Sequence, residues 1–131
     1  SGLLGLSGRS NDCRELIQAR TEGDEAATLA LDVFCYRVAK YIASYLVPLG
    51  GLDALVFTGG IGENASLVRE LVLLRLGALG IELDKEANDS LGFGQAGVIS
   101  KQKHPLVLVI PTNEELMIAL DTYELISKGS N

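Results

Sequence analysis

The chain has 131 residues, of which 47% are apolar, and a formal net charge of -6. This length and composition predict one domain with a sizeable core. The acidic balance argues against non-specific binding to nucleic acid, which Lys and Arg side chains carry, and one histidine with two cysteines argues against a zinc site. A small phosphorylated ligand is compatible with this charge, because backbone amides can hold phosphate without a basic patch.

The N-terminal segment SGLLGLSGRS lacks the basic region and the long apolar run of a signal peptide. The longest predicted helix carries charged residues in its middle, which argues against a membrane span. We therefore expect a cytoplasmic protein with no membrane partner, in which Cys13 and Cys35 are small buried residues in a reducing compartment. The sequence lacks an initiating Met, which is compatible with a processed, engineered or shortened chain.

Helical periodicity dominates the first half of the chain. A small apolar helix is predicted over residues 1–6, and a short helix over residues 13–20. A long helix is predicted over residues 24–46, and Pro48 with the Gly50–Gly51 pair ends it. Its apolar positions recur at the helical period at Ala27, Leu31, Phe34, Cys35, Val38, Ile42 and Leu46.

The second half of the chain alternates strands with helices. Strands are predicted at residues 53–58, 81–83, 97–100 and 106–110. Helices are predicted at residues 64–76, 85–91 and 114–127. The alternation favours an α/β fold with a mostly parallel or mixed sheet flanked by helices.

Two of these strands, residues 53–58 and 106–110, are apolar enough to be buried on both faces. Sheets that bury central strands usually have about four to six strands, which is more than this chain clearly offers. We therefore expect residues 1–131 to be a single partial domain of a larger protein, whose further strands complete the sheet.

The glycine-rich segment after residues 53–58 is the main candidate site. Gly59, Gly60 and Gly62 allow positive φ and close approach of a ligand to the backbone, and Asn64 is placed to cap the next helix. Backbone N–H groups and the positive end of a helix then meet at one point, which suits a phosphate or a nucleotide. A tight strand-to-helix connection without a ligand is the alternative.

The same segment has a second interpretation, as a dinucleotide fingerprint. Gly60, Gly62 and Ala65 match G-x-G-x-x-A after a strand, and Glu82 and Asp84 follow about twenty residues on, where a ribose-binding acid belongs. The position of this segment behind a long helix argues against that interpretation. A Walker-type phosphate loop is excluded, since no Lys-Ser or Lys-Thr pair follows the glycines.

Two further segments carry candidate site residues. Thr112 and Glu115 have the spacing of a capping box, which leaves Glu114 free at a strand's carboxyl end, where an acid can hold Mg²⁺. Arg14 is either a solvated residue after a helix cap or a group that pairs with phosphate or stacks on a base. His104 lies in a polar turn and is expected at the surface.

Taken together, these segments resemble the acetate kinase, or acetokinase, family. The matching motifs occur in family order and run the length of the chain, but they cover only the C-terminal part of a family member. They are SGLLG at the start, DCR at 12–14, FTGGIGEN at 57–64, VRE at 68–70, LGxLG at 76–80 and IPTNEE at 110–115.

The resemblance implies the C-terminal part of a three-layer, actin-like ATPase domain, as in the actin, Hsp70 and sugar kinase superfamily. Acetokinases transfer phosphoryl between ATP and a short carboxylate, giving an acyl phosphate and ADP, and they are Mg²⁺-dependent cytoplasmic homodimers. The positions that match the family's nucleotide-binding residues are Asp12, Cys13, Arg14, Gly60, Ile61, Gly62, Glu63 and Asn64, and its magnesium-associated glutamate matches Glu114.

The family's substrate-side residues lie upstream of this sequence, so we assign no catalytic residue, and His104 matches no motif. The leading hypothesis is the C-terminal part of an acetate kinase, which binds adenine nucleotide but does not catalyse by itself. A propionate or butyrate kinase is the near alternative, because the carboxylate pocket lies outside this sequence. A dinucleotide-binding domain and a non-catalytic module that self-associates through an open sheet edge are the alternatives from other classes.

Overall fold

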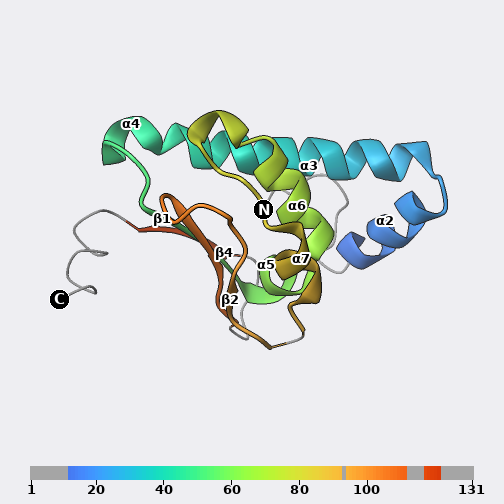
Figure 1. The fold of residues 1–131 in the computed structure, drawn as a ribbon. Coiled ribbons are helices and arrows are strands. Elements are labelled where there is room, and N and C mark those ends of the chain that lie inside the picture. The colour runs from blue at the N-terminus through green and yellow to red at the C-terminus, as the bar shows by residue number, and fades with distance from the viewer. Residues whose placement is uncertain (1–11, 93, 112–116, 122–131) are drawn as a thin grey trace.

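The structure is a computed structural model that describes residues 12–92, 94–111 and 117–121. A long helix, α3 (Glu25–Ser44), runs across the top of a small sheet, and α2 (Asp12–Thr21) packs against it (Figure 1). The remaining helices are α4 (Leu46–Leu49), α5 (Gly59–Asn64), α6 (Ser66–Leu74) and α7 (Lys85–Ser90), with a 3₁₀ turn at Gly77–Leu79. The strands are β1 (Ala54–Thr58), β2 (Gly97–Val98), β3 (Leu106–Val109) and β4 (Met117–Asp121).

The four strands form one mixed sheet in the order β2-β3-β1-β4. The strand β1 pairs in parallel with β3, which places Leu55 opposite Val107, and antiparallel with β4, which places Thr58 opposite Met117. The strand β2 pairs antiparallel with β3. A small mixed sheet flanked by helices confirms the predicted fold class.

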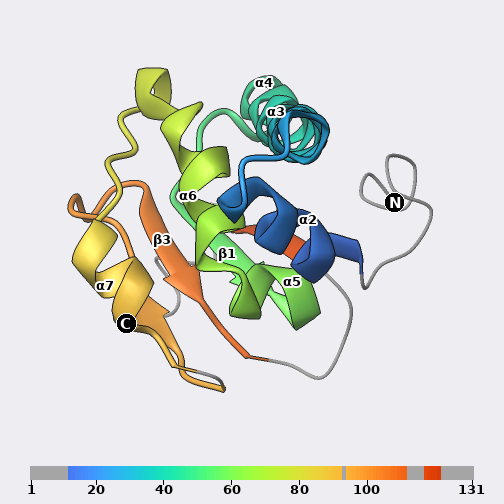
Figure 2. The ribbon, with the colours of Figure 1, turned by 90° about the vertical axis from the view of Figure 1, so that its right-hand side faces the viewer.

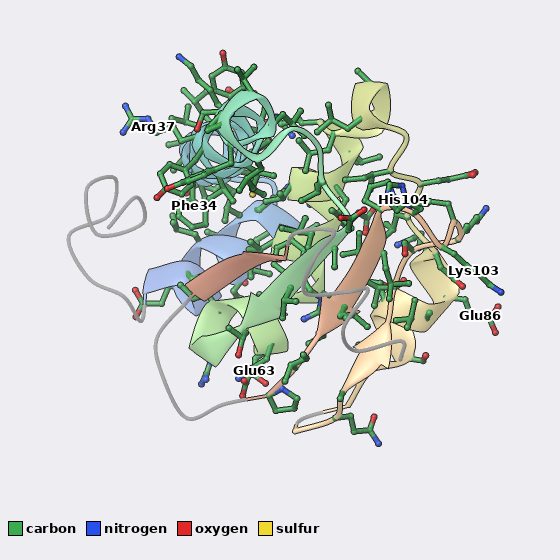
Figure 3. The ribbon with its side chains drawn as sticks, turned by 90° about the vertical axis from the view of Figure 1, so that its left-hand side faces the viewer. Phe34, Arg37, Glu63, Glu86, Lys103 and His104 are labelled. Atoms are coloured by element: carbon green, nitrogen blue, oxygen red, sulfur yellow. The ribbon has the colours of Figure 1, made fainter. Side chains whose placement is uncertain are left out.

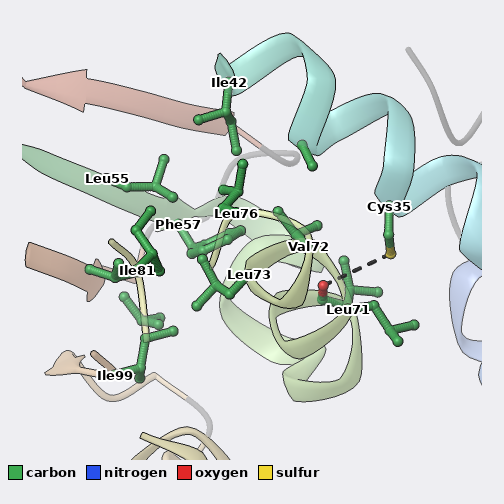
Figure 4. Packing of buried hydrophobic residues seen from close by; sticks show 14 of the residues in the cluster. Cys35, Ile42, Leu55, Phe57, Leu71, Val72, Leu73, Leu76, Ile81 and Ile99 are labelled. Carbon is green, nitrogen blue, oxygen red and sulfur yellow. Dashed lines mark hydrogen bonds between the residues drawn. The ribbon is translucent and has the colours of Figure 1, made fainter. Parts of the chain in front are cut away.

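The core lies between the sheet, α3 and α6. Side chains from β1, such as Phe57, meet Val72 of α6 and Ile42 of α3 in one cluster (Figure 4). The largest of these residues, including Phe34, are almost completely buried, and burying such a side chain contributes about 1.5–3 kcal/mol. All five residues of β1 are buried, as its apolar run predicts.

The helix α3 confirms the long helix that the apolar periodicity predicts over residues 24–46. The Asp24 side chain caps α3 by accepting a hydrogen bond from the Ala27 N–H at 3.0 Å. The helix ends at Ser44, and the chain turns after α4 at Gly50, whose φ of 72° favours glycine. Within the described residues, no helix combines the length and the apolar character that a membrane span requires.

The prediction of a helix over residues 114–127 is wrong for residues 117–121, the part of that range that the structure describes. Residues 117–121 form the strand β4 instead, antiparallel to β1. The physical reason is that β1 is buried, and its backbone groups on the side away from β3 need hydrogen-bond partners. That requirement outweighs the helix propensity of Met, Ala and Leu in this segment. The predicted helix over residues 1–6 lies outside the described residues.

Two shorter predictions are also corrected. The strand predicted at residues 81–83 is reduced to a single antiparallel bridge between Leu83 and Ser100. The strand predicted at residues 97–100 is the two-residue β2, whereas the short helix predicted at residues 85–91 is confirmed as α7. Short pairings of this kind depend on partners distant in sequence, which periodicity cannot show.

Candidate functional site

The glycine-rich segment is a short helix rather than an open turn. The helix α5 begins directly at the carboxyl end of β1, and its first residue, Gly59, has a φ of 80°. A side chain is strained at that angle, so the chain needs glycine where the strand turns into the helix. Gly60 and Gly62 lie within this helix, which the sequence did not predict, whereas the helix predicted over residues 64–76 is confirmed as α6.

The prediction that Asn64 caps the following helix is wrong. Asn64 is the last residue of α5, and Ala65 occupies the N-cap position of α6 without a side-chain cap. Ala65 has a φ of -113° and a ψ of 86°, so the chain bends there between the two helices. The Asn64 side chain is therefore exposed and free of a capping role.

The start of α5 also has no side-chain cap. Thr58 occupies its N-cap position, but its side chain makes no capping hydrogen bond. The Thr58 hydroxyl is buried, and none of the described residues is a hydrogen-bond partner for it. The first N–H groups of a helix have no partner within the helix, so the expected anion-binding segment stays a prediction that concerns this end of α5.

A pocket of about 260 Å³ lies beside α5. It brings Arg14 of α2 together with Glu63 and Asn64 of α5, which are three of the predicted site residues. The complete lining is Arg14, Glu63, Asn64, Ser66, Arg69, Leu91 and Gly92. Pockets for whole small ligands usually measure about 300–1,000 Å³, so this pocket is slightly smaller than a site of that kind.

The other predicted nucleotide residues lie outside the lining of this pocket. Cys13 is 4% exposed and belongs to the hydrophobic core, where burial raises the pKa of its thiol. Gly60 is exposed, whereas Ile61 packs partly against the core. Gly62 is buried, and the side chain of Asp12 is not among those described. Both cysteines are buried, as expected.

Glu114 lies outside the described residues. The described residues on its two sides lie close to the end of β1. The Ile110 N–H donates to the Phe57 carbonyl at 2.9 Å, and Met117 pairs with Thr58. Among the residues that the structure describes, no three His, Cys, Asp or Glu side chains gather closely enough to hold a metal ion.

Arg69 lines the pocket although the sequence analysis did not assign it to the site. It is 1% exposed, and burial lowers the pKa of its guanidinium, an effect that the charge of Asp89 opposes. Its Nη1 donates to the Gly62 carbonyl at 3.0 Å, so it connects α6 with α5. The match of VRE at residues 68–70 to the family motif was the available signal.

Asn88 of α7 is the partner of Arg69. Its Oδ1 accepts from the Arg69 Nε at 2.7 Å, and its carbonyl accepts from the Arg69 Nη2 at 3.2 Å. Its Nδ2 donates to the Ser66 carbonyl at 3.0 Å. Asn88 is fully buried, so α7 is attached to α6 through hydrogen bonds that water does not reach.

The acids of the dinucleotide interpretation serve other purposes. The Asp84 side chain caps α7 by accepting from the Ala87 N–H at 3.0 Å. Glu82 is exposed, and neither acid lines the pocket. This pocket therefore gives no support to the dinucleotide interpretation.

His104 is exposed, as the sequence predicts, and its Nε2 contacts the Asp53 carboxylate. Figure 3 shows His104 and Glu63 at different ends of the sheet. His104 is therefore not a component of the candidate site.

A sequence model of the acetokinase family matches residues 1–120. The chain belongs to the acetokinase family. It is 57% identical over 128 residues to an acetate kinase of Shewanella amazonensis, covering 98% of this chain and 32% of that relative. The chain therefore spans about a third of the length of the curated relatives that it matches.

Two solved structures of acetokinases share the fold. The acetate kinase of Porphyromonas gingivalis matches with a TM-score of 0.72 at 38% identity, covering 97% of this chain and 30% of that one. The propionate kinase of Francisella tularensis matches with a TM-score of 0.73 at 43% identity, covering 86% of this chain and 28% of that one. These acetokinase structures confirm the expected actin-like ATPase fold.

Proposed function

We propose that this chain is the C-terminal, nucleotide-side part of an acetate kinase, which transfers phosphoryl between ATP and acetate to give acetyl phosphate and ADP. The observation that carries the proposal is the pocket that gathers Arg14, Glu63 and Asn64 from α2 and α5. The identity of 57% to an acetate kinase supports the choice of substrate.

The residues of the site have distinct roles in this proposal. Arg14 pairs with phosphate or stacks on the base. The backbone N–H groups at the start of α5 hold phosphate oxygens, which explains why Thr58 provides no side-chain cap there. The Asn64 amide faces the same pocket, where it can donate to the nucleotide.

The remaining nucleotide positions act through the backbone. Cys13 is buried in the core, and so contributes its main chain to the contact made by Asp12 and Arg14. Gly60, Ile61, Gly62 and Glu63 form the body of α5.

Glu114 is the residue that would hold Mg²⁺, directly or through water. Bound Mg²⁺ neutralises phosphate charge during phosphoryl transfer. This role rests on the match of IPTNEE to the family motif.

In this proposal, residues 1–131 are a single partial domain of a cytoplasmic homodimer. The rest of the protein supplies the carboxylate pocket and the groups that stabilise the transferred phosphoryl. Phosphoryl transfer depends on in-line positioning and charge neutralisation by both sides of the cleft. The chain alone therefore binds adenine nucleotide weakly and does not turn over. Kinase activity of the purified chain above trace rates would contradict this statement.

A propionate or butyrate kinase is the alternative within the family, and a propionate kinase is among the structural neighbours. The residues that select the acyl chain lie outside this sequence in either case, so both enzymes share the nucleotide side described here. Activity of the full-length protein with acetate, propionate and butyrate distinguishes them, and a higher kcat/KM for acetate is expected.

Calorimetric titration of the chain with ADP, ATP and NAD in the presence of Mg²⁺ tests the proposed site. We expect binding of ADP and ATP but not of NAD. Arg14→Ala should weaken ADP binding by about tenfold or more, because a hydrogen bond to a charged group contributes about 1.5–3 kcal/mol. Arg37→Ala is the matched control, since Arg37 is exposed on α3 and does not line the pocket.

Two outcomes would contradict the proposal. Preferential binding of NAD would favour a dinucleotide-binding domain. Concentration-dependent light scattering that no nucleotide changes, together with no binding, would favour an interaction module.

A further inference from the structure

The buried guanidinium of Arg69 connects three helices. Its Nη1 bonds the Gly62 carbonyl of α5, while its Nε and Nη2 bond the Oδ1 and the carbonyl of Asn88 on α7. Asn88 in turn donates to the Ser66 carbonyl at the start of α6. Figure 2 shows α5, α6 and α7 next to one another, with α7 on the side of α6 away from α2.

Each of the three guanidinium nitrogens of Arg69 has one defined hydrogen-bond acceptor. Asn88 accepts from Nε and Nη2, so the guanidinium plane is held from the α7 side. Nη1 is then directed at the Gly62 carbonyl. The Ser66 carbonyl holds the Asn88 amide in the orientation that presents Oδ1 to Arg69. A buried polar network whose members are all paired is rigid and specifies one geometry.

The helix α5 depends on such support from outside. It has six residues, and no side-chain hydrogen bond caps the position before or after it. Helices this short are not stable by themselves, because the nucleation cost is spread over few hydrogen bonds. Gly62 immediately precedes Glu63 and Asn64, which line the pocket, so a displacement of the Gly62 carbonyl moves both of them.

We propose that Asn88 is a positioning residue for nucleotide binding, which acts through Arg69 on the α5 backbone. This inference rests on the proposed function, because it concerns the same pocket. Asn88 does not itself line that pocket and lies outside every motif that pointed to a nucleotide. Substitution of Asn88 should loosen α5 and weaken nucleotide binding without removing any direct contact between the protein and the nucleotide.

Lys85 offers a matched control for Asn88. It also attaches α7 to α6, with Nζ 3.1 Å from the Glu70 Oε1, and it lies on the same short helix as Asn88. Its side chain is 64% exposed, and its described hydrogen bonds reach Glu70 and Asp89 but not α5. Lys85→Ala therefore perturbs the contact between α6 and α7 without touching the connection to Gly62.

The test compares Asn88→Ala, Arg69→Lys and Lys85→Ala in the full chain by two measurements below their unfolding temperatures. The first is the Kd for Mg-ADP, and the second is amide hydrogen exchange over residues 59–66. Asn88→Ala should weaken ADP binding by about tenfold and speed exchange in α5 by a similar factor, whereas Lys85→Ala should change both by less than about twofold. Arg69 itself lines the pocket, so Arg69→Lys is compared by hydrogen exchange alone, where it should speed exchange in α5 as Asn88→Ala does.

A merely structural role would lower the unfolding temperature of Asn88→Ala while leaving the Kd and the exchange of α5 unchanged, and that result would overturn the inference. If Asn88→Ala does not fold, Asn88→Ser replaces it in both measurements, because serine keeps a polar side chain but is too short to make both side-chain hydrogen bonds of Asn88. If the unsubstituted chain binds no ADP, the proposed function of the chain fails on its own. Hydrogen exchange still decides whether Asn88 positions α5, since unchanged exchange in the variants contradicts it.

Discussion

Arg69 and Lys85 both attach α7 to α6, but they do so in opposite surroundings. Arg69 is 1% exposed and makes directional hydrogen bonds to a side chain and to backbone carbonyls. The Lys85 side chain is 64% exposed and forms ion pairs with Glu70 and Asp89. Removing one partner from a buried network leaves the other groups unpaired and out of reach of water, whereas an exposed ion pair is replaced by hydration. The buried connection should therefore decide how α5, α6 and α7 are held together.

The largest effect is expected from Arg69→Ala. It leaves the Gly62 carbonyl and both oxygens of Asn88 without their buried donor and removes a well-packed side chain. We expect the free energy of unfolding to fall by about 3–5 kcal/mol, which urea denaturation monitored by circular dichroism measures. A loss below about 1 kcal/mol would mean that Arg69 contributes no more than a surface cation.

A smaller effect is expected from the pH dependence of a buried thiol. Burial raises the pKa of Cys35 to about 12 from its ordinary value of 9.0, and its Sγ lies 3.9 Å from the Val68 carbonyl of α6. The unfolded chain then loses the thiol proton near pH 9 while the folded chain keeps it. This contribution to stability is complete below pH 9 and is lost as the pH rises from about 9 towards 12.

Chemical denaturation at pH 8, 9 and 10 compares the unsubstituted chain with Cys35→Ala. The unsubstituted chain should lose up to about 1.4 kcal/mol more per pH unit above pH 9 than the variant. Parallel pH profiles for the two proteins would show that the folded thiol ionises as readily as the unfolded one.

The smallest effect is expected from Lys85→Ala. Hydrogen bonds to Asp89 and then to Glu70 raise the pKa of Lys85 above 10.5, so its ion pairs contribute below that pH and are lost above it. We expect a slight fall in the unfolding temperature at neutral pH and low salt, and no difference from the unsubstituted chain in 1 M NaCl. A large, salt-independent fall would contradict the contrast with Arg69.

The parts of the fold that follow a local period could be predicted from the sequence. The apolar positions of α3 and the continuous apolar runs of β1 and β3 give these elements their correct type and nearly correct ends. The strand β4 could not be predicted, because its residues favour a helix locally and form a strand only in contact with β1. A local pattern of apolar residues cannot reveal pairing between strands that lie so far apart in the sequence.

In the candidate site too, local motifs could be predicted from the sequence, whereas contacts between distant residues could not. Arg14, Glu63 and Asn64 were predicted from motifs, and the structure brings them to one pocket. The burial of Arg69 could not be predicted, because a charged residue on an amphipathic helix is usually solvated and its partner Asn88 belongs to a different helix. The capping role assigned to Asn64 was wrong because the break between α5 and α6 falls at Ala65.

In the proposed function, the pocket between α2 and α5 binds adenine nucleotide. Hydrogen exchange of the chain with and without saturating Mg-ADP tests this most directly, because it locates the ligand in the sequence. We expect slower exchange in peptides that contain Arg14 and residues 59–66, with no change across the exposed face of α3 around Tyr36. No protection at either segment, or protection confined to α3, would contradict it.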